Sequence, residues 1–453
     1  MQSEKSVASE KLPNRWLIAG MGTLLQLCLG SVYAWSYFQK PLTEGYGWSN
    51  AQVAWTFSLA IGFLGLAAAA GGVALPRFGP RTLAVTGSLL FGAGHLLAAL
   101  ALHLHSLPLL WLGYGVIGGI GLGLGYVTPV ATAAKWFPDK KGLVTGMVVM
   151  GFGFGALLMS KVIAPALAAA FAGRLPLVFA GAGVILGGAG LVAAWFMRNP
   201  PTADASAGRS GFTPDSGRIV GDKPVGDKPR PTDRGLPGAI PAAPGVAEIP
   251  VAATPTDWRR FALMWLVFFC NIAAGIAIIG FQSPLLQDLC RQKDAALSAA
   301  ALAGLGATLI AVSSLFNGLG RLLWGALSDR LGQLRTFRAM LGTQVAAFAA
   351  LIVVRDPWLF GGLVCYVLLC YGGGFGVMPS FVLNTFGARR MPVFYGCILT
   401  AWSAAGVVGP QVVARLKDHF GAEAAGHAFA LGAGLLALGF LLSLLLRDRE
   451  RTS

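Results

Sequence analysis

Long apolar runs recur along almost the whole sequence. A bilayer core needs about 20 predominantly apolar residues per helix, and twelve segments of the chain meet this requirement. They predict an all-α polytopic membrane protein with twelve transmembrane helices. The expected spans are 15–38, 51–75, 82–103, 108–131, 143–168, 175–197, 259–282, 297–324, 337–354, 358–383, 394–416 and 426–446.

The composition excludes most other classes of protein. Only 12% of the residues are charged and 55% are hydrophobic, whereas about 25% of an ordinary soluble protein is charged. A disordered chain, a coiled coil and a secreted disulfide scaffold are excluded on the same figures. The six cysteines form no CxxC pair and have no histidine at metal-binding spacing, so no disulfide framework, metal or cofactor is expected. The first apolar run is too long for a signal peptide and should stay as a spanning helix.

The net charge of +15 comes from 34 Lys and Arg against 19 Asp and Glu. Twelve spans place both termini on one side of the membrane. If that side is the cytoplasm, 25 of the 34 basic residues lie inside, eight lie at or near the outside, and Arg321 lies within the membrane. This bias obeys the positive-inside rule. Topology therefore explains the charge without a nucleic-acid partner, and predicts a multi-pass protein of the cytoplasmic (inner) membrane with both termini cytoplasmic. A monomer is expected.

A polar stretch divides the twelve spans into six and six. It is rich in Pro, Gly and Asp and contains GDKP twice, at 221–224 and 226–229. The halves also resemble each other, because Arg77 follows span two as Arg330 follows span eight, 253 residues later. A duplicated six-helix unit is typical of rocking transporters. The expected organisation is a cytoplasmic tail 1–14, a bundle 15–197, a linker 198–258, a second bundle 259–446 and a tail 447–453.

Arg321 is the one charged residue predicted deep in the membrane. Asp329 marks the cytoplasmic end of span eight, and Arg321 lies eight residues earlier, about 12 Å along the helix. A midplane Arg costs about 2.5–3.5 kcal/mol even on the lenient insertion scale, and such residues usually face a polar cavity. Every carboxylate can be assigned to a loop, a terminus or a helix end. An anion that binds reversibly is therefore the expected counter-charge, and the guanidinium matches a carboxylate.

Helical spacing suggests neighbours for Arg321. Asn317 lies four residues earlier, on the same helix face, where it can hold the guanidinium or offer an amide to the substrate. On other spans, aromatic and apolar residues recur three or four residues apart, a pattern that more often indicates ordinary packing in the hydrophobic core. His95, the one histidine inside a span, is the only candidate proton carrier, although packing is favoured. Lys161 falls on the opposite face of its helix from Phe152. No catalytic triad or carboxylate pair occurs, so an enzyme is not expected.

Three motifs resemble the oxalate/formate antiporter family of the major facilitator superfamily, which is close to the monocarboxylate transporters. They are Leu29-Gly-Ser-Val-Tyr33-Ala-Trp35, the block from Tyr126 to Gly142 with Lys135-Trp136-Phe137-Pro138-Asp139, and Asn317-Gly-Leu-Gly-Arg321. The resemblance implies a central cavity with an essential arginine at Arg321. It also implies that the site is lined by Tyr33, Tyr126, Phe152, Tyr371, Phe375, Leu399 and Trp402. Asp329, Arg330 and Arg77 belong to the loop motifs associated with gating.

Two departures from the family bear on the substrate. Trp402 stands where the oxalate-binding member has a lysine, and Asn317 stands where many animal monocarboxylate transporters have an aspartate. One cavity cation neutralises one carboxylate, and a dianion would keep an unpaired charge in a low dielectric. The expected function is alternating-access transport of a lactate-, pyruvate- or formate-type monocarboxylate, by proton symport or anion exchange. The alternatives are an oxalate or other dicarboxylate antiporter, drug or siderophore export, and a non-transporting carboxylate sensor.

Overall fold

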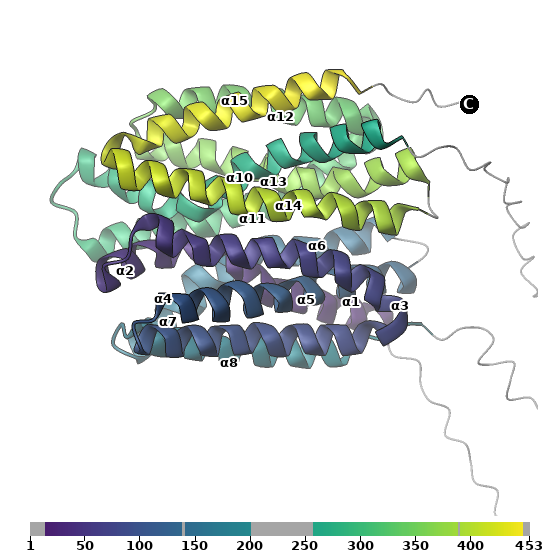
Figure 1. The fold of residues 1–453 in the computed structure, drawn as a ribbon, viewed down its shortest axis with the longest axis horizontal. Helices are drawn as coiled ribbons and strands as arrows, with labels where there is room; N and C mark the ends of the chain where they lie inside the picture. Colours follow the sequence, from purple (N-terminus) through teal and green to yellow (C-terminus); the bar gives the residue numbers. More distant parts are fainter. Residues whose placement is uncertain (1–13, 138–140, 201–256, 388–389, 447–453) are drawn as a thin grey trace, which may run out of the picture. The chain divides into compact units, whose positions relative to one another are not determined.

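The computed structural model describes residues 14–137, 141–200, 257–387 and 390–446. The described residues are almost entirely helical, and eleven of their helices are long and apolar enough to cross a membrane. Figure 1 shows α1–α8 gathered in one group and α10–α15 in another. Most of the predicted linker 198–258, and nearly all of both predicted tails, lie outside the described residues.

The first group contains six spans. The chain runs through α1 (Arg15–Gly30), a 3-10 turn at Ser31–Ala34 and α2 (Trp35–Tyr46), so the first span continues well past the predicted end at residue 38. The remaining elements are α3 (Asn50–His103), α4 (Leu107–Leu110), a π-helical turn at Trp111–Gly118, α5 (Gly119–Trp136), α6 (Lys141–Leu158), a π-helical turn at Met159–Ile163, α7 (Ala164–Ala170) and α8 (Leu175–Trp195).

The helix α3 is two spans joined at a kink. Gly79 has φ 76° and ψ 163°, which is outside the helical range, and prolines at 76 and 80 flank it. The predicted spans 51–75 and 82–103 are therefore both present within this element, and the described residues contain twelve membrane crossings. A glycine is needed here because a side chain would make this positive φ costly.

The second group contains the other six spans. They are α10 (Trp258–Lys293), α11 (Ala299–Leu331), α12 (Gln333–Val353), α13 (Pro357–Phe386), α14 (Met391–Phe420) and α15 (Ala424–Leu444). Gly332, which separates α11 from α12, has φ 87° and ψ 149°. It lies 253 residues after Gly79, so the same break occurs at the same place in both halves. This shared backbone conformation agrees with the predicted duplication.

The two groups meet mainly along two helix pairs, and α2 also packs against α10. The α6 helix packs against α11, and α3 packs against α14. We call the side of the protein at which α1 begins the proximal side. The opposite side, which contains the α2–α3 and α10–α11 connections, is the distal side. On the distal side Ser49 caps α3 through a reciprocal pair of hydrogen bonds with Gln52, which ends the α2–α3 connection sharply.

Candidate functional site

The Arg321 side chain lies buried between the two groups of helices. Only 3% of its surface is exposed, and its Nη1 donates a hydrogen bond to the carbonyl oxygen of Val149 on α6 at 3.1 Å. Its Nε and Nη2 have no hydrogen-bond partner among the described residues, and no described carboxylate forms an ion pair with it. Leaving a buried charge unpaired costs several kcal/mol. The site is therefore electrostatically incomplete without an anion.

The two unpartnered nitrogens define how an anion would bind. Nε and Nη2 share one edge of the planar guanidinium, and their N–H bonds point the same way. The spacing of these two donors matches the two oxygens of a carboxylate. Because Val149 engages the other nitrogen, Nη1, the free edge offers one bidentate position.

Six buried aromatic side chains surround this position, and we call them the aromatic cage. Arg321 Cζ lies 5.0 Å from the ring centre of Phe375 and 5.9 Å from that of Phe152. The Trp402 ring centre lies 4.7 Å from Phe375 and 5.3 Å from Tyr126. All six are at most 3% exposed and come from five different spans: Tyr33, Tyr126, Phe152, Tyr371, Phe375 and Trp402.

The cage is closed by a hydrogen bond between the two groups of helices. The hydroxyl oxygens of Tyr33 and Tyr371 are 2.7 Å apart, and the Tyr33 ring packs edge-on against Phe152 at 5.0 Å. Nearby, the Ser314 hydroxyl of α11 donates to the carbonyl oxygen of Gly153 on α6. Both halves of the chain are therefore needed to form the site.

Asn317 lies one turn before Arg321 and is 1% exposed. Its Oδ1 has no hydrogen-bond partner among the described residues. A Cβ added at Gly372 would overlap the Asn317 carbonyl oxygen, so α11 and α13 meet backbone to backbone at this level. The close approach brings Tyr371 and Phe375 of α13 up to the arginine.

Comparison with known proteins agrees with this architecture. The family model described as "Major Facilitator Superfamily" matches residues 19–410. The chain belongs to this superfamily. It is 26% identical to the oxalate:formate antiporter of Oxalobacter formigenes over 416 residues, covering 90% of this chain and 87% of the relative. It is 29% identical to apicoplast pyruvate carrier 1 of Toxoplasma gondii over 434 residues, covering 85% and 73%.

A solved structure shows the same fold at much lower identity. The nucleoside transporter NupG aligns with a TM-score of 0.66 and 12% identity, covering 96% of this chain and all of that one. These findings confirm the predicted resemblance and fold class. The chain is an integral membrane protein of a transporter superfamily.

One residue of this protein that lies beside the aromatic cage was not predicted from the sequence. Tyr395 of α14 lies within electrostatic reach of both Tyr126 and Arg321. It precedes Leu399 by four residues, so helical spacing from Leu399 could have found it. Leu399 itself is 2% exposed, and its backbone packs against Gly65 of α3, where an added Cβ would lie 2.9 Å from the Leu399 carbonyl oxygen.

His95, the predicted candidate proton carrier, and Lys161, which helical spacing placed on the opposite face from Phe152, lie elsewhere. His95 is buried within the first group, where Nδ1 is 3.0 Å from the Phe91 carbonyl oxygen and the ring packs against Tyr114 at 5.0 Å. These contacts are those of a packed histidine, away from the cage. Lys161 is exposed, and its Nζ donates to the Thr308 hydroxyl of α11 at 2.6 Å.

The predicted gating residues lie at the proximal helix ends. Asp329 and Arg330 are exposed at the end of α11. Arg77 is also exposed, and its Cζ is 5.4 Å from the ring centre of the adjacent Phe78. Their role in gating stays a prediction.

The tyrosine pair can be tested by comparing single and double substitutions. Tyr33→Phe or Tyr371→Phe alone leaves one buried hydroxyl without its partner, which costs about 1–3 kcal/mol, whereas replacing both partners can be nearly neutral. We expect each single variant to lower the unfolding midpoint in detergent by more than the double variant does. Strictly additive losses would contradict a hydrogen bond between these residues.

Proposed function

We propose that this protein is a secondary active transporter that moves small monocarboxylates across the cytoplasmic membrane by alternating access. The observation that supports this most directly is the buried, unpaired Nε–Nη2 edge of Arg321 inside an aromatic cage. In the proposed orientation both termini are cytoplasmic and the distal side faces outward. The protein is not an enzyme in this proposal.

The substrate carboxylate binds the free edge of Arg321 through two parallel hydrogen bonds. Tyr126 and Tyr371 supply hydroxyl donors, and Asn317 lies beside the guanidinium on the same face of α11. Phe152, Phe375, Leu399 and Trp402 form the wall for the apolar part of the substrate. Because the cage excludes water, the charge pair is stronger than it would be in solution.

A monocarboxylate fits this site better than a dicarboxylate. Arg321 is the one cation in contact with the cage rings among the described residues, so a second carboxylate would enter a low dielectric without a partner. The Trp402 Nε1 is buried and has no hydrogen-bond partner among the described residues. It can donate one hydrogen bond to a keto or hydroxyl oxygen, as pyruvate and lactate carry. The relatives include a pyruvate carrier and an oxalate:formate antiporter. A dicarboxylate antiporter is therefore the second candidate function.

Coupling by proton symport differs measurably from coupling by anion exchange. Purified protein in liposomes should take up labelled pyruvate or lactate, and unlabelled monocarboxylates should compete better than oxalate. Acidification of the lumen during uptake indicates symport, whereas dependence on a trapped anion indicates exchange. Stronger competition by oxalate would favour the dicarboxylate antiporter. Binding without flux would favour a sensor and contradict transport.

Replacing the arginine tests the binding mode. Arg321→Lys keeps the charge but removes the planar fork, and loss of a buried hydrogen-bonded charge pair costs about 2–5 kcal/mol. We expect uptake to fall to background. Arg355→Lys is the matched control, because Arg355 is exposed and donates to carbonyls of its own segment, those of Ile352 and Val354. Substantial uptake by the Arg321→Lys variant would contradict the role of Arg321.

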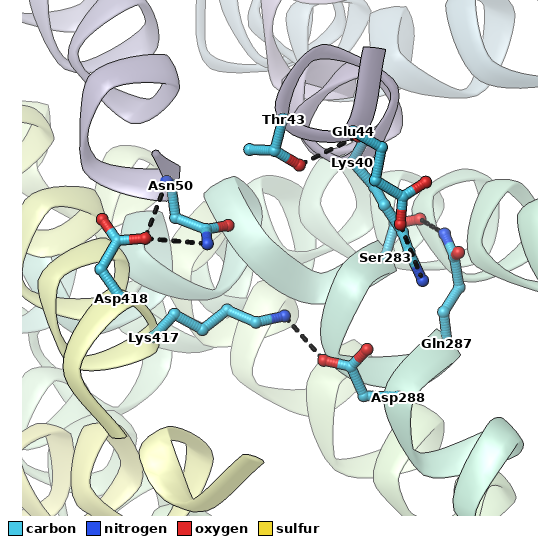
Figure 2. Close-up of polar contacts among 9 residues, drawn as sticks. All are labelled: Lys40, Thr43, Glu44, Asn50, Ser283, Gln287, Asp288, Lys417 and Asp418. Atoms are coloured by element: carbon cyan, nitrogen blue, oxygen red, sulfur yellow. Dashed lines mark hydrogen bonds and ion pairs between the residues drawn. The ribbon is translucent and has the colours of Figure 1, made fainter. Parts of the chain in front are cut away.

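Alternating access requires that contacts between the two helix groups break on one side at a time. On the distal side the Asp418 carboxylate of α14 accepts hydrogen bonds from the backbone N–H groups of Asn50 and Ala51, both at 2.8 Å, at the start of α3. Asn50 Nδ2 donates to it as well, at 3.0 Å. Figure 2 shows this contact beside the Lys417–Asp288 ion pair. A carboxylate at a helix N-terminus is stabilised by the helix dipole and the free N–H groups.

Removal of this distal contact should favour the outward-open state. In a Cys397→Ala background, spin labels at Gly45→Cys and Gly426→Cys report the distance between the groups, since a Cβ added at either glycine meets no atom within 4 Å. We expect Asp418→Ala to raise the population with a longer distance. Ser298→Ala serves as the control, because the Ser298 hydroxyl caps the distal end of α11 by accepting from the Ala301 N–H of the same helix. An unchanged distance distribution would contradict the proposed distal closure.

A further inference from the structure

A cavity opens on the side of the second helix group. It has a volume of about 490 Å³ and lies between α10, α11 and α13 near the distal side. Its walls are apolar, and no residue of the aromatic cage lines it. The wall residues on which the argument depends are Leu286, Leu309, Val312, Phe316, Gly362 and Cys365. We call this cavity the lateral groove.

The lateral groove faces the surroundings of the protein rather than its centre. Val312 and Phe316 are 38% and 37% exposed, and they lie on the face of α11 turned away from Asn317 and Arg321. Because α11 spans the membrane, these side chains meet lipid. An apolar cavity offers a water molecule too few hydrogen-bond partners to hold it. A hydrocarbon chain is the ligand that both the walls and the surroundings favour.

The distal rim of the lateral groove is polar and carries charges of both signs. Lys293 Nζ lies 2.7 Å from Asp356 Oδ2, and this hydrogen bond holds the pKa of Asp356 below its ordinary value, so the carboxylate stays ionised. Asp294 lies beside Lys293 on the rim and uses one oxygen to accept from the Ala296 N–H at 2.9 Å. Lys161 adds a second ammonium, because its Nζ donates to the Thr308 hydroxyl, which also lines the groove. The charges around the groove therefore balance, and Lys293 and Asp294 are the oppositely charged residues that line it.

Trp358 completes the rim and is 79% exposed. Tryptophan is enriched at the membrane–water interface, where its ring lies at the level of the lipid headgroups. Its position therefore puts the charged rim at headgroup depth and the apolar walls at the depth of the acyl chains. The depth profile of the lateral groove matches that of a phospholipid.

We propose that the lateral groove binds a phospholipid with a primary-amine headgroup, of the phosphatidylethanolamine class. One acyl chain lies along Leu309, Val312 and Phe316. The headgroup ammonium approaches Asp294, and the phosphate approaches Lys293. A headgroup that carries both an ammonium and a phosphate can pair with Asp294 and Lys293 together, whereas the uncharged glycerol of phosphatidylglycerol offers Asp294 no counter-charge.

The groove can be filled without disturbing the fold. Gly362 lines it, and a Cβ added there meets no atom within 4 Å, so Gly362→Trp should occupy the space of the acyl chain. The matched control is Gly434→Trp on α15, a glycine with the same open surroundings that does not line the groove. A second variant, Asp294→Asn, changes only the charge of the rim.

Native mass spectrometry of the full chain, with phosphatidylethanolamine and phosphatidylglycerol added in equal amounts, measures the bound lipid. We expect the wild type and Gly434→Trp to retain one phosphatidylethanolamine, and Gly362→Trp to lose at least about tenfold in occupancy, a difference of 1.4 kcal/mol. Asp294→Asn should lower the preference over phosphatidylglycerol. Equal retention by Gly362→Trp and Gly434→Trp, or a wild-type preference for phosphatidylglycerol, would overturn the proposal. Because uptake is not measured, the result is independent of the proposed transport function.

Discussion

The desolvated charge of Arg321 is the constraint on which the rest of this structure depends. A guanidinium in the middle of a membrane span is tolerated only where protein or a ligand replaces its water. The protein supplies one hydrogen bond, from Nη1 to Val149, and two nearby aromatic faces. It leaves the Nε–Nη2 edge without a hydrogen-bond partner among the residues that the structure describes. This unmet electrostatic need of one residue is the basis for proposing an anionic ligand.

The close approach of helices at the level of Arg321 depends on small residues. A Cβ added at Gly153 of α6 would lie 2.6 Å from Gly318 Cα of α11, so any side chain there would separate the two groups. Polar contacts join them elsewhere, at Tyr33–Tyr371, Lys161–Thr308 and Asp418–Asn50. Inside a bilayer, helices associate through packing and hydrogen bonds rather than through the hydrophobic effect. Contacts of this kind can be exchanged at modest cost when one group moves against the other.

Sequence patterns predicted the spans well and the side-chain environment only partly. Apolar length located all twelve crossings, including the two that α3 joins at Gly79. It did not predict that the first span continues to Tyr46, because hydrogen bonding continues a helix past the end of its apolar run. Spacing related Asn317 to Arg321, but it could not relate residues on different helices. The cage was inferred from family resemblance, and Tyr395, the Asp418 contact and the lateral groove were not predicted.

The sequence by itself determined the class of the protein, its number of spans and the presence of one costly buried cation. These follow from the length of the apolar segments and from the free-energy cost of placing a charge in the bilayer core, both of which act on each segment separately. Only the tertiary structure decided which aromatic residues surround Arg321, which of its nitrogens stay free, and that His95 packs away from them. Those facts depend on how separate helices rotate and cross. That geometry results from packing between segments more than 100 residues apart, such as Tyr33 and Tyr371.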